Sequence, residues 1–236
     1  MSFCKLILFD PFRITTTTKI DLDMFGIGNY SAEVGFIPRN NYIKLETRGG
    51  HLVYTQKETP LLSHGPSVER TYYFDTSFEK NDQTTEFNYL FNFKNRSRFS
   101  LGFQNQFIQL LSDFDPLRTG IAELKKGTEH RWNSITLSYD SKPQNRFTYS
   151  IEALTGGYYN SGKRTAFLGE FGYRFQPFLE LNSVVNFNQI NLPAPWSDNA
   201  FWLLGMKANL TFTNTLFFSN LFQYNEQLGL WNFNSR

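Results

Sequence analysis

The residue types that perform catalysis or bind metals are present in this chain, but their spacing does not match that chemistry. The stretch from Gly157 to Lys163 reads G-x-x-x-x-G-K, which is how a phosphate-binding loop begins. Arg164 follows where such a loop carries the Ser or Thr that holds magnesium. The stretch also lies between two predicted strands, whereas phosphate binding uses the N-terminus of a following helix. We therefore predict a hairpin connection here.

The histidines give no stronger signal. His51, His64 and His130 are scattered along the chain without the short spacings of metal ligands, so we predict no metal site from them. Ser63 precedes His64, but no Asp is placed to orient the imidazole as a catalytic triad requires. These residues therefore predict neither a metal centre nor a hydrolase.

Two acidic residues in a long predicted loop are the last candidates for chemistry. Asp113 and Asp115 could bind Ca²⁺, but the surrounding sequence lacks the alternating Asn, Asp and Gly residues of a calcium loop. We expect a solvated loop. The sequence therefore predicts no catalytic residue, no cofactor and no metal, and an enzyme is the least supported class.

A ladder of polar and charged residues is the one chemical pattern that the spacing does favour. A turn centred on Pro177 would set Arg174 directly opposite Glu180, and the next strand would bring Lys207 near Asn182. Mixed-sign ladders of this kind either fill the lumen of a barrel or line a selective pore, and both interpretations stay open. The predicted members are Glu152, Glu170, Arg174, Glu180, Asn182, Lys207 and Asn209.

The elements that must carry this ladder are strands, because apolar residues alternate with polar ones over long segments. The segments run about 10–13 residues, longer than the usual 5–6 and near the ~9–11 that cross a bilayer at a tilt. Within these segments the apolar positions of the alternation span 87–93, 99–107, 147–153, 167–175, 179–187 and 202–212. On their apolar side we predict contact with lipid for Phe171, Tyr173, Leu181, Trp202, Leu204, Met206 and Leu210.

Composition limits the alternatives. Aromatic residues make up 18% of the 236 residues, with 26 Phe, yet the mean hydropathy is −0.41 and no apolar run is long enough for a transmembrane helix. A net charge of +2 gives no field that would recruit nucleic acid. The first residues lack the long apolar region and cleavage site of a secretory signal.

The connections between the predicted strands alternate between tight and longer ones, with a somewhat open one expected at 159–163, which is the layout of an up-and-down barrel with short turns at one end. We therefore predict an all-β fold: an antiparallel up-and-down transmembrane β-barrel with about 12–14 strands present, incomplete or open. The alternative is a soluble β-protein whose apolar faces pack against each other.

Five motifs suggest a family. In chain order they are EVGFIPRN at 33–40, LLSHGPSVE at 61–69, GGYYNSGKRT at 156–165, INLP at 190–193 and LFQYNEQ at 221–227. Together they resemble the C-terminal outer-membrane barrel of a Gram-negative family of unknown function, in which the barrel follows a carbohydrate-binding module resembling family nine. The resemblance covers about residues 27–236, whereas residues 1–26 match poorly.

The resemblance implies a location and a role. It implies the outer membrane of a Gram-negative bacterium, the lipid bilayer as partner, and a role as channel, export port or anchor for the carbohydrate-binding module. That module and the signal peptide are absent from these residues, and the chain stops at Arg236 within an apparent strand, so we expect a fragment truncated at its C-terminus. A carbohydrate partner would bind through the missing module. The alternative function is a soluble or surface β-protein that binds glycans through exposed aromatics.

Overall fold

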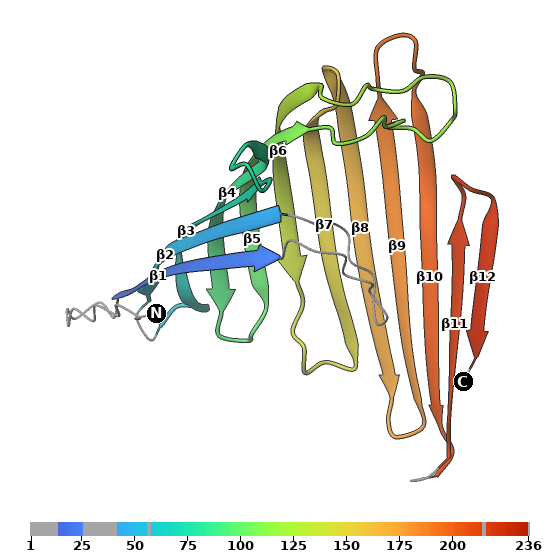
Figure 1. The fold of residues 1–236 in the computed structure, drawn as a ribbon. Helices are drawn as coiled ribbons and strands as arrows, with labels where there is room; N and C mark the ends of the chain where they lie inside the picture. Colours follow the sequence, from blue (N-terminus) through green and yellow to red (C-terminus); the bar gives the residue numbers. More distant parts are fainter. Residues whose placement is uncertain (1–13, 26–41, 56–57, 214–215, 236) are drawn as a thin grey trace.

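The computed structural model describes residues 14–25, 42–55, 58–213 and 216–235 (Figure 1). The motif at 33–40 and residues 1–13 of the poorly matching N-terminal segment lie outside the described residues. Within the described residues there is no helix of the length and hydrophobicity needed to cross a bilayer. The strands are β1 (Ile14–Phe25), β2 (Tyr42–Tyr54), β3 (Leu61–Phe74), β4 (Lys80–Phe93), β5 (Arg98–Gln109), β6 (Glu129–Asp140), β7 (Phe147–Tyr158), β8 (Gly162–Phe175), β9 (Leu179–Asn191), β10 (Asn199–Thr211), β11 (Phe217–Asn225) and β12 (Leu230–Ser235).

The twelve strands of the described residues belong to one antiparallel sheet in which the order in space equals the order in sequence. This confirms the prediction of an all-β, antiparallel, up-and-down fold, and the strand number falls within the expected range. Among the described residues β1 and β12 do not pair, so the sheet is open, which agrees with the prediction of an incomplete or open barrel. Figure 1 shows the sheet strongly curled, with β1 and β2 turned in front of β4 and β5.

The two faces of the sheet differ sharply in chemistry. Neighbouring strands pair in an almost continuous register, so alternate residues keep to one face from strand to strand: Phe103 pairs with Ile135, and Leu204 with Val185. The face that carries these residues is called the apolar face. Its exposed large apolar side chains are Val68, Phe87, Leu101, Phe103, Ile135, Leu137, Phe147, Phe167, Tyr173, Phe175, Trp202, Leu204, Met206, Phe218, Phe222, Trp231 and Phe233.

Cross-strand aromatic pairs hold neighbouring strands together on the apolar face. The rings of Phe187 and Trp202 lie 4.7 Å apart across β9 and β10, and those of Tyr224 and Trp231 lie 4.5 Å apart across β11 and β12. Such pairs stabilise an antiparallel ladder by roughly 0.2–1 kcal/mol each. The aromatic excess in the composition is therefore used mainly on one surface of the sheet.

The connections fall into two sets, one at each end of the strands. The longest described loops, at 110–128 and 192–198, lie at the same end, together with the turns at 75–79, 159–161 and 226–229. The opposite end carries the connections at 55–60, 94–97, 141–146, 176–178 and 212–216. The predicted difference between the two ends therefore rests on two loops rather than on all of the connections at one end.

The connection after β7 is tighter than the sequence predicted. Tyr158 still pairs with Gly162, and both Asn160 and Ser161 have positive φ, at 50° and 62°. Two successive residues with positive φ make the turn that best matches the twist of a hairpin. The expectation of an open loop was wrong. Asn160 and Ser161 adopt the tight turn without the glycine that usually indicates such a turn in a sequence. The G-x-x-x-x-G-K stretch is indeed a hairpin connection.

Candidate functional site

The polar face, opposite the apolar one, is the candidate functional site. The register sets Arg174 on β8 against Glu180 on β9, and Lys207 on β10 against Asn182. All seven predicted ladder residues lie on this face. The wider face also holds polar residues that the sequence analysis did not single out, among them Glu69, Glu86, Gln104, Ser134, Ser138, Asp140, Ser150, Arg164, Asn188, Ser219 and Gln223.

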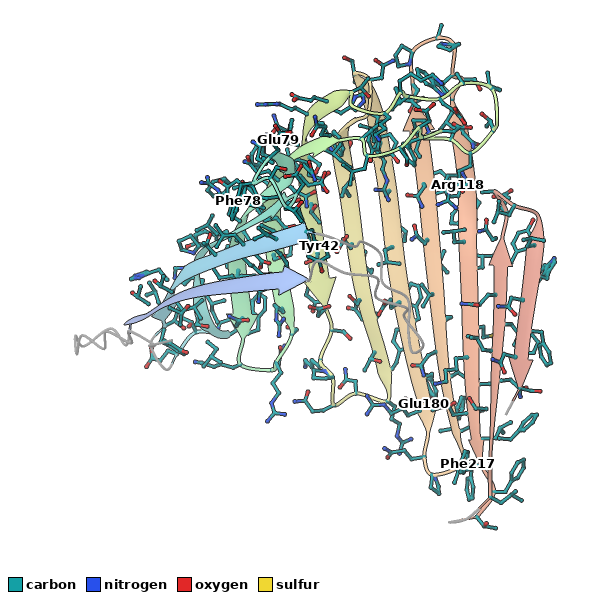
Figure 2. All side chains as sticks on the ribbon, viewed as in Figure 1. Tyr42, Phe78, Glu79, Arg118, Glu180 and Phe217 are labelled. Atoms are coloured by element: carbon teal, nitrogen blue, oxygen red, sulfur yellow. The ribbon has the colours of Figure 1, made fainter. Side chains whose placement is uncertain are left out.

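Hydrogen bonds cross the strands on the C-terminal half of the polar face. The Asn209 amide NH₂ donates to the Glu180 carboxylate at 3.2 Å, and the Ser219 hydroxyl donates to the Asn209 amide oxygen at 2.8 Å. The Arg174 guanidinium instead donates to the carbonyl oxygen of Pro143 at 3.2 Å, in the neighbouring turn. In this part of the ladder, side-chain hydrogen bonds therefore link β9, β10 and β11. Figure 2 shows Glu180 near the turn that joins β8 and β9.

A second hydrogen-bonded row crosses the centre of the polar face. The Gln104 amide donates to the Glu86 carboxylate at 2.8 Å and accepts from the Ser134 hydroxyl at 3.3 Å. A hollow of about 250 Å³ lies beside this row, and Glu86 and Glu152 are both among its lining residues. Two carboxylates in one polar hollow favour cations over anions there.

Ion pairs dominate the N-terminal part of the same face. Arg48 contacts Glu46 at 2.8 Å and Glu69 at 2.9 Å, and Lys44 contacts Glu46 at 2.5 Å. These side chains are partly exposed, so the pairs contribute only modestly to stability. Their effect is to neutralise charge along β2 and β3.

One loop closes over the polar face. Residues 110–128 fold back across the strands at the long-loop end, as Figure 1 shows in green in front of the upper strands. The indole N–H of Trp196 donates to the carbonyl oxygen of Ala122 at 3.0 Å, and the Gln227 amide donates to the carbonyl oxygen of Leu117 at 2.9 Å. The loop therefore reaches from β5 to the turn between β11 and β12. Figure 2 shows Arg118, from the same loop, in front of the upper part of the sheet.

A hydrophobic cluster fixes this loop, which is called the capping loop below. Leu117 is the most buried of its side chains, at 1% exposed. The cluster brings the loop against the ends of β9 and β10 and the connection between them, through Leu110, Leu117, Leu124, Ile190, Leu192, Trp196 and Phe201. The structure therefore places its main hydrophobic core at the mouth of the polar face rather than between two sheets.

The acidic residues of the capping loop serve its conformation. The Asp115 carboxylate accepts from the backbone N–H groups of Leu117 and Gly120, at 3.0 and 2.7 Å. Burial opposes ionisation of Asp115, but these backbone donors outweigh it and lower its pKa. The Lys125 ammonium and the backbone N–H of Lys126 donate to Asp113, and these hydrogen bonds lower the pKa of its carboxyl group. No group of metal ligands occurs among the described residues.

The remaining candidate pair, Ser63 and His64, does not form a site. Ser63 accepts a hydrogen bond from Asn92 at 3.1 Å, whereas the His64 ring contacts the Tyr89 hydroxyl at 2.7 Å and stacks on Phe91. Adjacent residues of a strand point to opposite faces, so the two side chains do not meet.

The residues that the sequence analysis assigned to lipid contact share the apolar face. The register pairs Tyr173 with Leu181 and Met206 with Ser183 on that side of the sheet. In full, this group is Phe171, Tyr173, Leu181, Trp202, Leu204, Met206 and Leu210. Their contact with lipid stays a prediction.

Comparison of the chain with protein-family models, curated proteins and solved structures finds no match in any of the three. The resemblance to the outer-membrane family therefore rests on the five motifs alone.

Proposed function

We propose that this chain forms the wall of a β-barrel in a Gram-negative outer membrane, with its apolar face in lipid and its polar face toward an aqueous lumen. The supporting observation is the division of a single curled sheet into one exposed aromatic face and one hydrogen-bonded polar face. A soluble protein gains from covering such an aromatic surface, whereas lipid solvates it directly.

The role that this arrangement supports best is a channel or export port whose mouth is narrowed by the capping loop. The loop lies over the polar face and is held there by packed side chains and by the hydrogen bonds of Trp196 and Gln227. Loops folded into the lumen are a common way to narrow such barrels. A barrel that anchors the carbohydrate-binding module implied by the resemblance would have the same wall.

Reconstitution tests this function. We expect the chain to fold only in detergent or lipid, to float with neutral phosphatidylcholine vesicles, and to produce stepwise ion conductance in planar bilayers once its strand edges have paired with those of other copies. Vesicle insertion without conductance would favour the anchor over the channel. A monodisperse protein that stays soluble without detergent would overturn the membrane proposal and favour the soluble glycan-binding alternative.

A further inference from the structure

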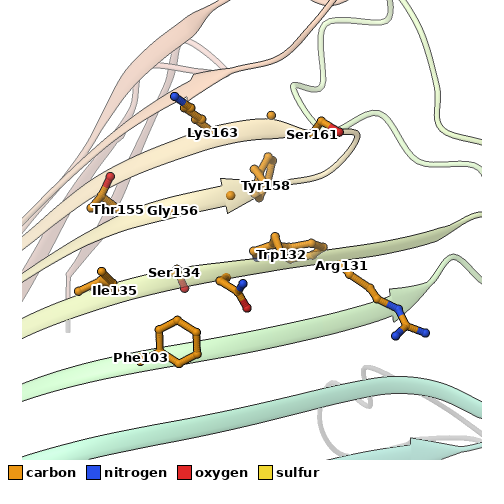
Figure 3. Close-up of a pocket in the computed structure, with 13 residues that line it drawn as sticks. Phe103, Arg131, Trp132, Ser134, Ile135, Thr155, Gly156, Tyr158, Ser161 and Lys163 are labelled. Carbon is orange, nitrogen blue, oxygen red and sulfur yellow. The ribbon is translucent and has the colours of Figure 1, made fainter.

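A groove of about 630 Å³ opens on the apolar face near the long-loop end, between β6 and β7 (Figure 3). The pairing of these two strands ends at Ser134 and Gly156, although both strands continue toward the loops. Gly157 is the next residue of β7 and presents no side chain between them. At this level β7 passes close to β6, since a Cβ on Gly157 would lie 2.7 Å from the Trp132 Cβ, and the missing glycine side chain leaves the apolar face hollowed there.

The groove joins an apolar floor to a basic rim. Phe103 and Ile135, which are 41% and 49% exposed, line its part nearer the middle of the sheet. Arg131 and Lys163 line its part nearer the loops and come from strands on either side of β7, as Figure 3 shows. No Asp or Glu is among its lining residues.

In the part of the chain that the structure describes, neither Arg131 nor Lys163 forms an ion pair. The ion pairs found there lie within β2, join β2 to β3, or lie within the capping loop. The Arg131 guanidinium instead sits 4.6 Å from the centre of the Phe107 ring, a cation–π contact that holds it in place. Glu129 is the nearest acidic residue on the same strand, and it lies outside the groove.

Charge and shape select one kind of occupant. A free anion would use the two cations but would gain nothing from Phe103 and Ile135. A sugar ring would need an open aromatic face, but the rings of Trp132 and Tyr158 each pack 4.8 Å from Tyr159. An amphiphile with an anionic phosphate headgroup and acyl chains uses both parts, with its phosphate at the rim and its chains on the floor.

We propose that this groove binds an anionic phospholipid, with Arg131 and Lys163 contacting the phosphate and with Phe103 and Ile135 contacting the acyl chains. The inference rests on the proposed membrane location, because only then does the rim of the apolar face lie at the depth of lipid headgroups. It adds a specific lipid site to a surface that otherwise contacts lipid without selectivity.

Tryptophan quenching by brominated lipids tests the site. In one protein all four native tryptophans are changed to Phe and Ile135→Trp places a single tryptophan on the groove floor; in a reference protein only Trp202 is kept, on the apolar face of β10. Each is reconstituted in phosphatidylcholine vesicles with either brominated phosphatidic acid or brominated phosphatidylcholine. Each cation near an anionic lipid contributes about fivefold in binding, so the tryptophan at position 135 should favour phosphatidic acid by about thirtyfold. Trp202 should show no preference.

Variants separate the site from general charge effects. Arg131→Gln with Lys163→Gln should abolish the preference at position 135, whereas Arg131→Lys with Lys163→Arg should retain it. The matched control, Arg174→Gln with Lys207→Gln, removes the same charge from the polar face and should leave the preference intact. Inorganic phosphate, against chloride at equal ionic strength, should not displace the brominated lipid.

The outcomes distinguish the two proposals. Quenching of Trp202 by neutral brominated lipid with no anionic preference at position 135 would overturn the lipid site and leave the membrane location intact. If the matched control lost the preference for phosphatidic acid to the same extent, the lipid site would be overturned. Full displacement of the brominated lipid by inorganic phosphate would also overturn it. Absence of quenching at both tryptophans would overturn the membrane location and the lipid site with it.

Discussion

At the scale of single residues, the face on which a side chain lies should decide its tolerance to charge. Leu204→Arg, on the apolar face, should destabilise the inserted protein by about 2–4 kcal/mol, because a charge near mid-bilayer loses its hydration. Asn182→Arg adds the same side chain on the polar face, beside Glu180 and across from Lys207, and should cost under ~1 kcal/mol. Urea titrations of folding into phosphatidylcholine vesicles measure both. Equal destabilisation would mean that the faces are wrongly assigned.

The acidic residues of the capping loop should make its closure depend on pH. The folded-state pKa values of Asp113 and Asp115 are lowered from the ordinary 3.8, so their stabilisation is complete above about pH 4 and is lost as the pH falls through the lowered values. Hydrogen exchange of residues 110–128, corrected for intrinsic rates, should therefore accelerate below about pH 4. Asp115→Asn should exchange faster already at pH 7 and respond less to acid. Exchange that is independent of pH in the unmodified protein would contradict this role.

At the scale of elements, much of the sheet could be predicted from local pattern. Period-two alternation located β4, β5 and β7 to β10 and predicted their two faces. The turn around Pro177 was enough to set Arg174 against Glu180, because register follows from turn geometry. The hydrogen-bond partners could not be predicted in this way. The Arg174 side chain, near the end of β8, donates a hydrogen bond to Pro143 in the turn before β7, and no strand pattern predicts this contact.

The capping loop shows the same limit more clearly. Leu117 and Leu124 follow no strand or helix period, so the segment read as a solvated loop. Its partners Ile190, Trp196 and Phe201 lie far along the chain, and only the folded sheet brings them to the same mouth. The cluster is a tertiary feature, and the one local signal was the unusual number of leucines in a long connection.

Packing of Trp196 should control this loop. Trp196→Ala removes a buried side chain and the hydrogen bond to Ala122, and should cost about 3–5 kcal/mol of the packing that holds the loop on the polar face. We expect faster proteolysis within residues 110–128 and a larger single-channel conductance. Trp196→Phe keeps most of the packing but lacks the indole N–H. Its proteolysis rate and conductance should fall between those of the unmodified protein and those of Trp196→Ala. An unchanged conductance with a released loop would show that the loop does not narrow the lumen.

At the scale of the whole molecule, the two faces of the sheet favour a closed barrel, whereas its two edge strands leave it open. The faces suit a cylinder that separates lipid from water, and a cylinder in lipid has no edge because every backbone N–H and C=O group pairs. In the described residues, β1 and β12 each pair with a single neighbour. Each unpaired group in lipid costs several kcal/mol, so these edges must find partners in a membrane.

The chain of 236 residues by itself should therefore assemble edge to edge rather than form a heat-modifiable monomer in detergent. Size-exclusion chromatography with light scattering should show species larger than one chain. Single prolines at Asn232 and at Phe233 test the mechanism, because successive N–H groups of a strand point to opposite sides. The proline whose missing N–H pointed away from β11 leaves the β11–β12 ladder intact, and it should limit assembly to dimers formed through β1. A protease-resistant monomer of the unmodified chain would show that its edges close on each other in detergent and that the open sheet is not the state in that environment.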